Sequence, residues 1–189
     1  MKKGIVLLFS FLFLFGISSH AFAAENKDTE QALKLIEKTN ANIDKEIDKT
    51  VEKANKLQNL YFHQILLVKG SDQIYSLRLE QTKLENQLLN TTDEQKAAEL
   101  RASIESIDKK VAEVESKLSE QSSYFAKVTA QFNQDLNQLI ADLDAKTKQM
   151  TAETIQKAAE LGVTAACDWK LVKIAHKWIW IDPIAIVGS

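Results

Sequence analysis

Residues 28–161 contain no proline and a single glycine, Gly70, and this feature constrains the fold of the chain more than any other. Proline and glycine are the two residues that most strongly interrupt an α-helix. The same stretch is rich in alanine, leucine, lysine, glutamate and glutamine, which all favour the helix. The sequence therefore predicts helix over most of its length.

Apolar side chains in the second half of this stretch recur at alternating steps of three and four residues. The series is Ala97, Leu100, Ile104, Ile107, Val111, Val114, Leu118, Gln121, Phe125, Val128, Phe132, Asp135, Leu139 and Asp142. Toward its end the apolar stripe drifts to Leu136 and Leu143, because a helix with 3.6 residues per turn drifts against a repeat of 3.5. The spacing indicates a sustained coiled-coil seam.

A weaker series of the same kind occupies the first half. It comprises Ile36, Asn40, Ile43, Ile47, Thr50, Ala54, Leu57 and Tyr61, then Leu60, Leu67 and Ile74 at intervals of seven, and finally Leu77, Gln81, Leu84 and Leu88. The polar members Asn40 and Thr50 are expected to set the register at a cost in stability. The phase changes at residues 69–72, where the helix either continues with a stutter or breaks near 70–71, with Ser71 or Asp72 capping a new helix.

A turn is predicted at residues 90–92, where Thr92 and Gln95 have the spacing of a capping box. The arms on either side, residues 28–90 and 93–155, are equally long, about 95 Å each as helix. Equal arms favour a hairpin within one chain, and a homodimer that buries the same stripes between two chains is the alternative. The predicted fold is dominated by α-helix, with a long antiparallel coiled-coil helical hairpin over residues 24–161 and a small C-terminal β-hairpin.

The composition changes after Gly162, and all three tryptophans of the chain lie in residues 163–189. Two runs rich in β-branched residues and tryptophan, residues 167–174 and 177–183, predict the β-hairpin. A two-residue loop at Ala175 and His176 would place Leu171 opposite Trp180, and a four-residue loop is the alternative.

This register gives the hairpin an aliphatic and an aromatic face. The aliphatic face carries Val172, Ile174, Ile179 and Ile181, which Ile155 and Leu161 of the helical body could cover. The aromatic face is the candidate partner-binding site, formed by Trp169, Trp178 and Trp180 with Lys173 and Asp182 at its edge, and Trp169 lies across from Asp182. Tryptophan combines a large apolar area with a polar edge and concentrates in binding hot spots. The alternative is that the tryptophans complete a small core.

Residues 1–23 have the pattern of a cleaved signal peptide, with two lysines, an apolar run over residues 5–17 and a cleavage site that ends at Ala23. The apolar run is shorter than the roughly 20 residues that span a bilayer. The sequence therefore predicts a secreted, extracytoplasmic protein, at the cell wall or in the medium, of bacterial character. Without its signal the chain is acidic and has no cluster of lysine and arginine, which excludes the usual nucleic-acid binders.

Chemistry-bearing residues are sparse in residues 24–189, which contain two histidines, His63 and His176, and one cysteine, Cys167. No catalytic motif, phosphate-binding loop or metal-ligand spacing occurs. The sequence therefore predicts a protein that is not an enzyme, with no catalytic residue, no metal site and no cofactor.

These features together predict an exported, non-catalytic scaffold or spacer that binds a protein or another component of the cell envelope through residues 163–189. In broad form, a signal followed by a helical hairpin resembles the coiled-coil regions of exported cell-wall hydrolase activators, and the resemblance extends to architecture alone. The alternative is a pore-former-like or membrane-surface-binding helical protein. The longest aliphatic run of the helices, residues 65–68, is too short to span a bilayer, but residues 61–68 or the tryptophan face could bind its surface.

Overall fold

The structure is a computed structural model that describes residues 27–188 of the 189-residue chain. The predicted signal peptide, residues 1–23, lies outside the described residues. Four α-helices hold 76% of the described residues, and a small antiparallel β-hairpin follows them at the C-terminal end. The predicted dominance of helix and the C-terminal hairpin are thus confirmed.

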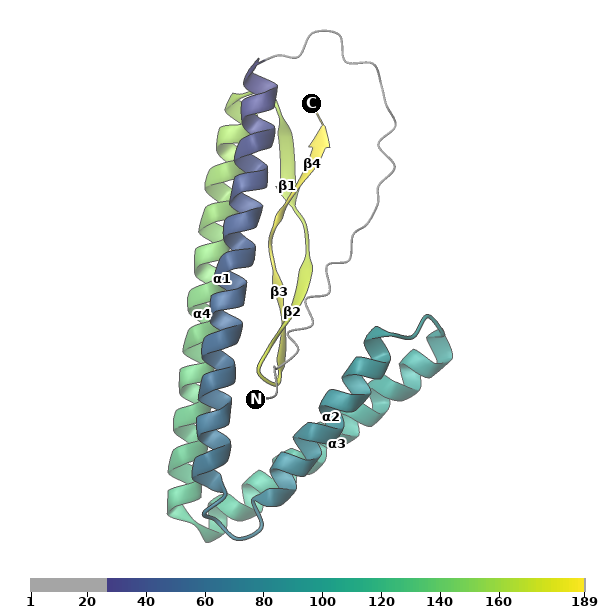
Figure 1. Cartoon of the computed structure of the whole chain (residues 1–189), viewed down its shortest axis with the longest axis vertical. Helices are drawn as coiled ribbons and strands as arrows, with labels where there is room; N and C mark the ends of the chain where they lie inside the picture. The colour runs from purple at the N-terminus through teal and green to yellow at the C-terminus, as the bar shows by residue number, and fades with distance from the viewer. Residues whose placement is uncertain (1–26, 189) are drawn as a thin grey trace, which may run out of the picture. The chain divides into compact units, whose positions relative to one another are not determined.

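Figure 1 shows the order of these elements along the chain. The helices are α1 (Lys27–Ile65), α2 (Asp72–Leu89), α3 (Glu94–Gln121) and α4 (Ser123–Glu160), and the strands are β1 (Thr164–Cys167), β2 (Lys170–Ile174), β3 (Lys177–Ile181) and β4 (Ile184–Gly188). They form two compact units: residues 27–53 with 139–188 make up unit 1, and Ala54–Gln138 make up unit 2. Within residues 27–188, none of the helices has the length and apolar content needed to cross a membrane.

Of the two alternatives at residues 69–72, a stutter or a break, the structure has the break, because α1 ends at Ile65 and α2 begins at Asp72. Gly70 has φ +92°, a left-handed conformation that glycine adopts without steric cost. Ser71 is buried, and its hydroxyl donates a hydrogen bond to the carbonyl oxygen of Ile65. Ser71 occupies the N-cap position of α2 as predicted, but its side chain makes no capping bond to that helix and instead closes the end of α1.

The predicted turn at residues 90–92 is also confirmed, and it joins α2 to α3, which lie side by side in Figure 1. The residue that caps α3 is Asp93, whose Oδ1 accepts a 3.0 Å hydrogen bond from the Lys96 amide. Thr92 was expected in this role. Asp93 takes it because its own backbone is extended, which is the conformation that a capping residue needs.

A second break, at Ser122, was not predicted. This residue is extended (φ −142°, ψ 108°) and separates α3 from α4. Its amide donates to the carbonyl oxygen of Leu118 at 2.9 Å, and its hydroxyl oxygen accepts from the amide of Phe125 at 3.1 Å. One residue therefore serves the end of α3 through its backbone amide and the start of α4 through its side chain.

The core of unit 2 follows most of the predicted seam. Its buried members include Ala54, Tyr61, Ile74, Ala97, Leu100, Ile107, Val111, Leu118, Phe125, Phe132 and Leu136. The Tyr61 ring stacks on that of Phe132, with centroids 4.4 Å apart, and its hydroxyl lies 3.2 Å from that of Thr129. Leu60 and Leu67 are exposed, however, so their predicted place on the seam is wrong. The seam passes through Tyr61 and Ile65, and α1 ends before Leu67.

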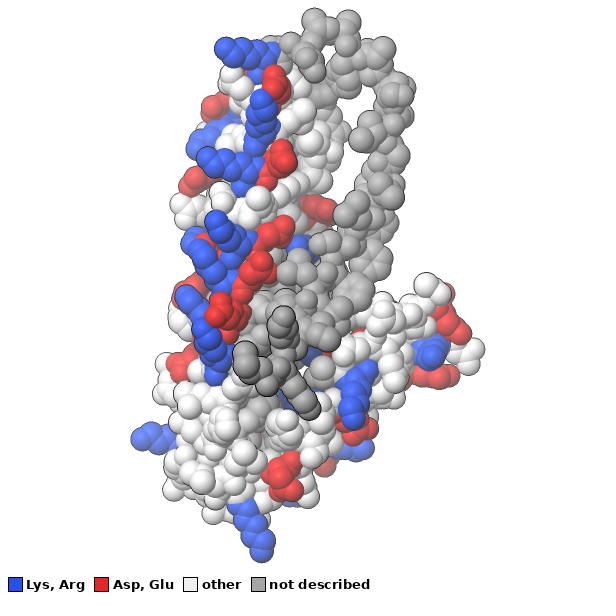
Figure 2. Space-filling view, viewed as in Figure 1, with Lys and Arg blue, Asp and Glu red and all other residues white. Residues whose placement is uncertain are grey.

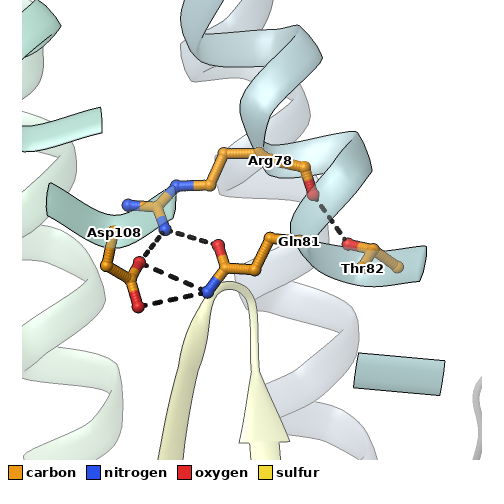
Figure 3. A network of polar contacts seen from close by, with 4 residues as sticks. All are labelled: Arg78, Gln81, Thr82 and Asp108. Carbon is orange, nitrogen blue, oxygen red and sulfur yellow. Dashed lines mark hydrogen bonds and ion pairs between the residues drawn. The ribbon is translucent and has the colours of Figure 1, made fainter. Parts of the chain in front are cut away.

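Figure 3 shows a polar network between α2 and α3. The Arg78 guanidinium lies 2.6 Å from the carboxylate of Asp108 on α3 and donates to Gln81 as well. Gln81, which is buried on the predicted seam, donates to both oxygens of Asp108 at 3.2 and 3.4 Å. The hydrogen bonds among these three side chains allow a polar residue, Gln81, to be buried on an otherwise apolar seam.

In unit 1 the first part of α1 lies antiparallel to the last part of α4. The hydroxyls of Thr39 and Thr154 share a 2.9 Å hydrogen bond, and Glu46 pairs with Lys146 at 2.8 Å. The drift of the stripe to Leu143 is confirmed by the burial of that residue. Beyond it the buried positions of α4 are three threonines, Thr147, Thr151 and Thr154, followed by Ala158.

Candidate functional site

The candidate site is the C-terminal ribbon, whose central register agrees with the prediction. Strands β2 and β3 pair Lys170 with Ile181, Leu171 with Trp180, Val172 with Ile179, Lys173 with Trp178 and Ile174 with Lys177. Two residues, Ala175 and His176, form the turn. Ala175 has φ +54° at the first central position, where a type II′ turn requires a positive φ.

The ribbon extends beyond the predicted hairpin, because β1 pairs with β4 in a second two-stranded ladder. The amide of Asp168 donates to the carbonyl oxygen of Pro183 at 2.7 Å between the two ladders. Trp169 was expected to pair with Asp182. The β2–β3 ladder ends at the pair of Lys170 and Ile181, so this expectation is wrong.

Asn40 of α1 fixes the inner edge of the ribbon. Its Nδ2 donates to the carbonyl oxygen of Ile184, and its Oδ1 accepts from the Ile184 amide, both at 2.9 Å. One side chain thereby satisfies both backbone groups of a buried residue at the start of β4. Asn40 was expected to set helix register, and it serves here to attach the ribbon to α1.

Apolar contacts hold the same end of the ribbon in place. Ala165 of β1 and Ile184 of β4 share a buried cluster with Ala32, Ile36, Ala158 and Val163, and the partly buried Ile155 and Leu161 pack against it. Ile155 and Leu161 were expected to cover the aliphatic residues of β2 and β3. They contact the cluster that contains β1 and β4 instead, because the ribbon is longer than predicted.

Two polar contacts continue this attachment along the helices. The Lys170 ammonium of β2 lies 2.7 Å from the carboxylate of Asp44 on α1. The Thr151 hydroxyl of α4 donates to the carbonyl oxygen of Asp182. Both helices of unit 1 therefore hold the ribbon through side chains aimed at its inner side.

The aromatic side of the ribbon faces outward. Trp169 is 62% exposed and Trp180 is 57% exposed, and their rings meet edge to face with centroids 6.5 Å apart. Trp178 and Leu171, which lie on the same side by strand alternation, are exposed as well. Lys173, across from Trp178, is partly buried. Four of the five predicted site residues thus belong to one outward face.

Asp182, the fifth predicted residue, lies elsewhere. It is 6% exposed, and its Oδ1 is buried without a hydrogen-bond partner among the described residues. It occupies the short bend between β3 and β4, where its backbone carbonyl is held by Thr151. A buried carboxylate cannot contact a partner at the surface, so the candidate face consists of Trp169, Leu171, Lys173, Trp178 and Trp180.

The charged side chains of unit 1 form local pairs. Hydrogen bonds from Lys146 and Lys49 lower the pKa of Glu46 to about 2. Figure 2 shows lysine, arginine, aspartate and glutamate interspersed on the visible face of the helices. Within residues 27–188 no three histidine, cysteine, aspartate or glutamate side chains are grouped as a metal ion would need, and Cys167 is an exposed free thiol.

Comparison with known proteins finds no matching protein family, no similar curated protein and no similar solved structure. The geometry of the ribbon and its helices therefore carries the functional argument.

Proposed function

We propose that this protein is an exported, non-catalytic scaffold that binds a component of the cell envelope through the outward face of its C-terminal ribbon. The observation that carries the proposal is the exposure of Trp169 and Trp180 on a ribbon whose other side is attached to α1 and α4. A surface fixed in this way needs little ordering when a partner binds, which lowers the entropic cost of association.

The chemistry of the face supports a protein or another envelope component as the partner. Exposed tryptophans leave apolar area in contact with water, and covering that area is favourable by about 25 cal/mol per Å². Each indole N–H can also donate a hydrogen bond at the edge of the contact. Lys173 adds a cation beside Trp178, which favours a partner with acceptor or acidic groups at that edge.

The helices supply the spacer in this proposal. The finer architecture that we propose is a long antiparallel coiled-coil hairpin formed by all four helices. Its support is local: Thr39 contacts Thr154 in unit 1, and Tyr61 contacts Thr129 in unit 2. Small-angle scattering of residues 24–189 tests it, since a rod requires a large axial ratio and a compact monomer would contradict it. Export rests on the signal pattern of residues 1–23.

The binding proposal is tested by co-sedimentation of residues 24–189 with the insoluble envelope fraction of the source cell. The Trp169→Ala/Trp180→Ala variant should lose at least about thirtyfold in affinity, because truncating a single hot-spot tryptophan typically costs about 2 kcal/mol. The matched control is Ile186→Ala/Val187→Ala, which truncates two exposed apolar side chains of β4 in the same ribbon. The control should bind like the unmodified protein.

Thermal melts of the same proteins separate binding from folding. Exposed tryptophans should leave the melting temperature nearly unchanged. A buried core role would instead cost about 3–5 kcal/mol of stability on truncation. Unchanged envelope binding by the tryptophan variant would refute the proposed role of the face, and release of dye from vesicles would favour the pore-former alternative.

A further inference from the structure

The loop between α1 and α2 presents apolar side chains to solvent. Leu66 is 57% exposed and Leu67 is 81% exposed, and Leu60 in the last turns of α1 is exposed as well. We name residues 66–71 the leucine loop. Leu60 lies within α1 beside the buried seam residue Tyr61 and is left off the seam. Leu67 follows the end of the helix at Ile65 and lies outside the core of unit 2.

Three amides of the leucine loop donate to backbone carbonyl groups of the loop or of the end of α1. The amide of Leu66 donates to Phe62 at 3.1 Å, that of Val68 to Ile65 at 2.8 Å, and that of Ser71 to Val68 at 3.2 Å. The Ser71 hydroxyl takes up the carbonyl oxygen of Ile65. A loop whose polar backbone groups bond internally loses few hydrogen bonds to water when it enters an apolar medium.

Carboxylates are absent from the two segments that meet beside this loop. The chain has 26 acidic residues, yet none lies in residues 53–71 or in residues 121–134. These segments adjoin each other within unit 2, where Tyr61 of α1 contacts Thr129 and Phe132 of α4. Their ionic residues are lysines, namely Lys53, Lys56, Lys69 and Lys127.

Figure 2 shows the corresponding surface, around the end of α1 and the start of α4, as mainly uncharged, with isolated basic side chains and a few acidic ones at its margin. Tyr124, in the first turn of α4, is exposed, and tyrosine is enriched at membrane interfaces. A projecting pair of leucines, beside two segments whose ionic residues are lysines, matches an anionic lipid surface in shape and in charge, and the nearest carboxylates belong to Asp72 and the end of α3. A protein partner would require a shaped pocket for the leucines and gives no reason why carboxylates are missing from residues 53–71 and 121–134.

We infer that the leucine loop binds the surface of an anionic lipid bilayer, with Leu66 and Leu67 at the boundary between headgroups and acyl chains and with Lys69 and Lys127 near lipid phosphates. The contact is interfacial, since the apolar run is far too short to span. This inference does not depend on the tryptophan face, which lies in unit 1.

The test is flotation of residues 24–189 with vesicles of phosphatidylcholine alone and of phosphatidylcholine mixed with phosphatidylglycerol. The protein should float with the anionic vesicles, and the Leu66→Gln/Leu67→Gln variant should bind roughly tenfold more weakly for each leucine replaced. Lys69→Gln should weaken binding to anionic vesicles by about fivefold, and added salt should act in the same direction.

Leu33→Gln/Leu79→Gln is the matched control, because it replaces two other exposed leucines of the helices. It should float like the unmodified protein, and melts should show that both double variants fold. The inference is overturned if the unmodified protein stays unbound, or if the loop variant and the control bind equally. It is also overturned if flotation depends on Trp169 and Trp180 alone, or if sedimentation shows a dimer that the loop variant dissociates, since a second copy would then cover the loop.

Discussion

Replacing Asn40 by alanine should detach the C-terminal ribbon from α1. The substitution removes both hydrogen bonds to Ile184 and leaves its amide and carbonyl groups buried without partners. Each orphaned group costs about 1–3 kcal/mol, while alanine in the helix returns about 0.5 kcal/mol through its higher propensity. Because Asn40 is only partly buried and water can reach some of the vacated space, we expect a net loss of about 2–4 kcal/mol.

Urea denaturation followed by tryptophan fluorescence measures this loss directly, since all three tryptophans lie in the ribbon. Hydrogen exchange at the Ile184 amide should accelerate in the same variant, because the amide loses its acceptor. Asn42→Ala is the matched control: Asn42 is an exposed asparagine on the same helix, and its replacement should be neutral or slightly stabilising. If the two variants differ by less than about 0.5 kcal/mol, the assignment of the ribbon attachment to Asn40 fails.

Three further predictions concern single residues. The pKa of Glu46 is lowered to about 2 from its ordinary 4.5, so its stabilising effect is present above pH 4.5 and is lost as the pH falls toward 2, and Glu46→Gln should flatten the melting temperature over that range. Burial raises the pKa of Tyr61 to about 12 from 10.0. Because the unfolded chain then ionises this tyrosine before the folded chain does, the free energy of unfolding falls as the pH rises from 10 toward 12, and Tyr61→Phe should reduce alkaline unfolding measured by circular dichroism. Ala175→Gly should stabilise the ribbon by about 1 kcal/mol in urea denaturation, because glycine adopts the positive φ of this turn position at no steric cost; a loss of stability would contradict the turn assignment.

The sequence predicts those parts of the fold that depend on local signals. Gly70 and the change of phase around it locate the break between α1 and α2, and the polar run at residues 90–92 locates the turn before α3. A two-residue loop at Ala175 and His176 predicts the register of β2 and β3, including the pair of Leu171 and Trp180, and the alternation of tryptophan with isoleucine predicts their faces. In each case the relevant residues lie within a few positions of one another.

Features that depend on distant contacts could not be predicted. Strand β1 has the sequence Thr-Ala-Ala-Cys, whose alanines have a low strand propensity, and its pairing with β4 decides its conformation. The attachment of Asn40 to Ile184 joins residues 144 positions apart, so neither sequence neighbourhood indicates it. Ser122 lies in a composition that favours helix, and no glycine or proline marks its break.

The aromatic part of the candidate site could be predicted from the sequence, but the position of Asp182 could not. Strand alternation puts Trp178 and Trp180 on one side whatever the ribbon packs against. The position of Asp182 depends on where β3 ends, and the bend at Pro183 removes it from the ladder. A carboxylate is usually exposed, so the sequence gives no sign that Asp182 is buried. The contact of this bend with Thr151, which buries Asp182, is visible in the structure alone.

Unit 1 is built from two stretches of chain that are far apart in the sequence, and this affects the order in which the two units fold. Unit 2 is one continuous segment, Ala54–Gln138, and it connects the two parts of unit 1. The ribbon follows unit 2 along the chain, whereas its anchor on α1, Asn40, precedes unit 2. Ordering unit 2 beforehand shortens the effective loop that must close, which lowers the entropy lost when the chain ends meet. We therefore expect unit 2 to gain protection from hydrogen exchange before the ribbon does during refolding.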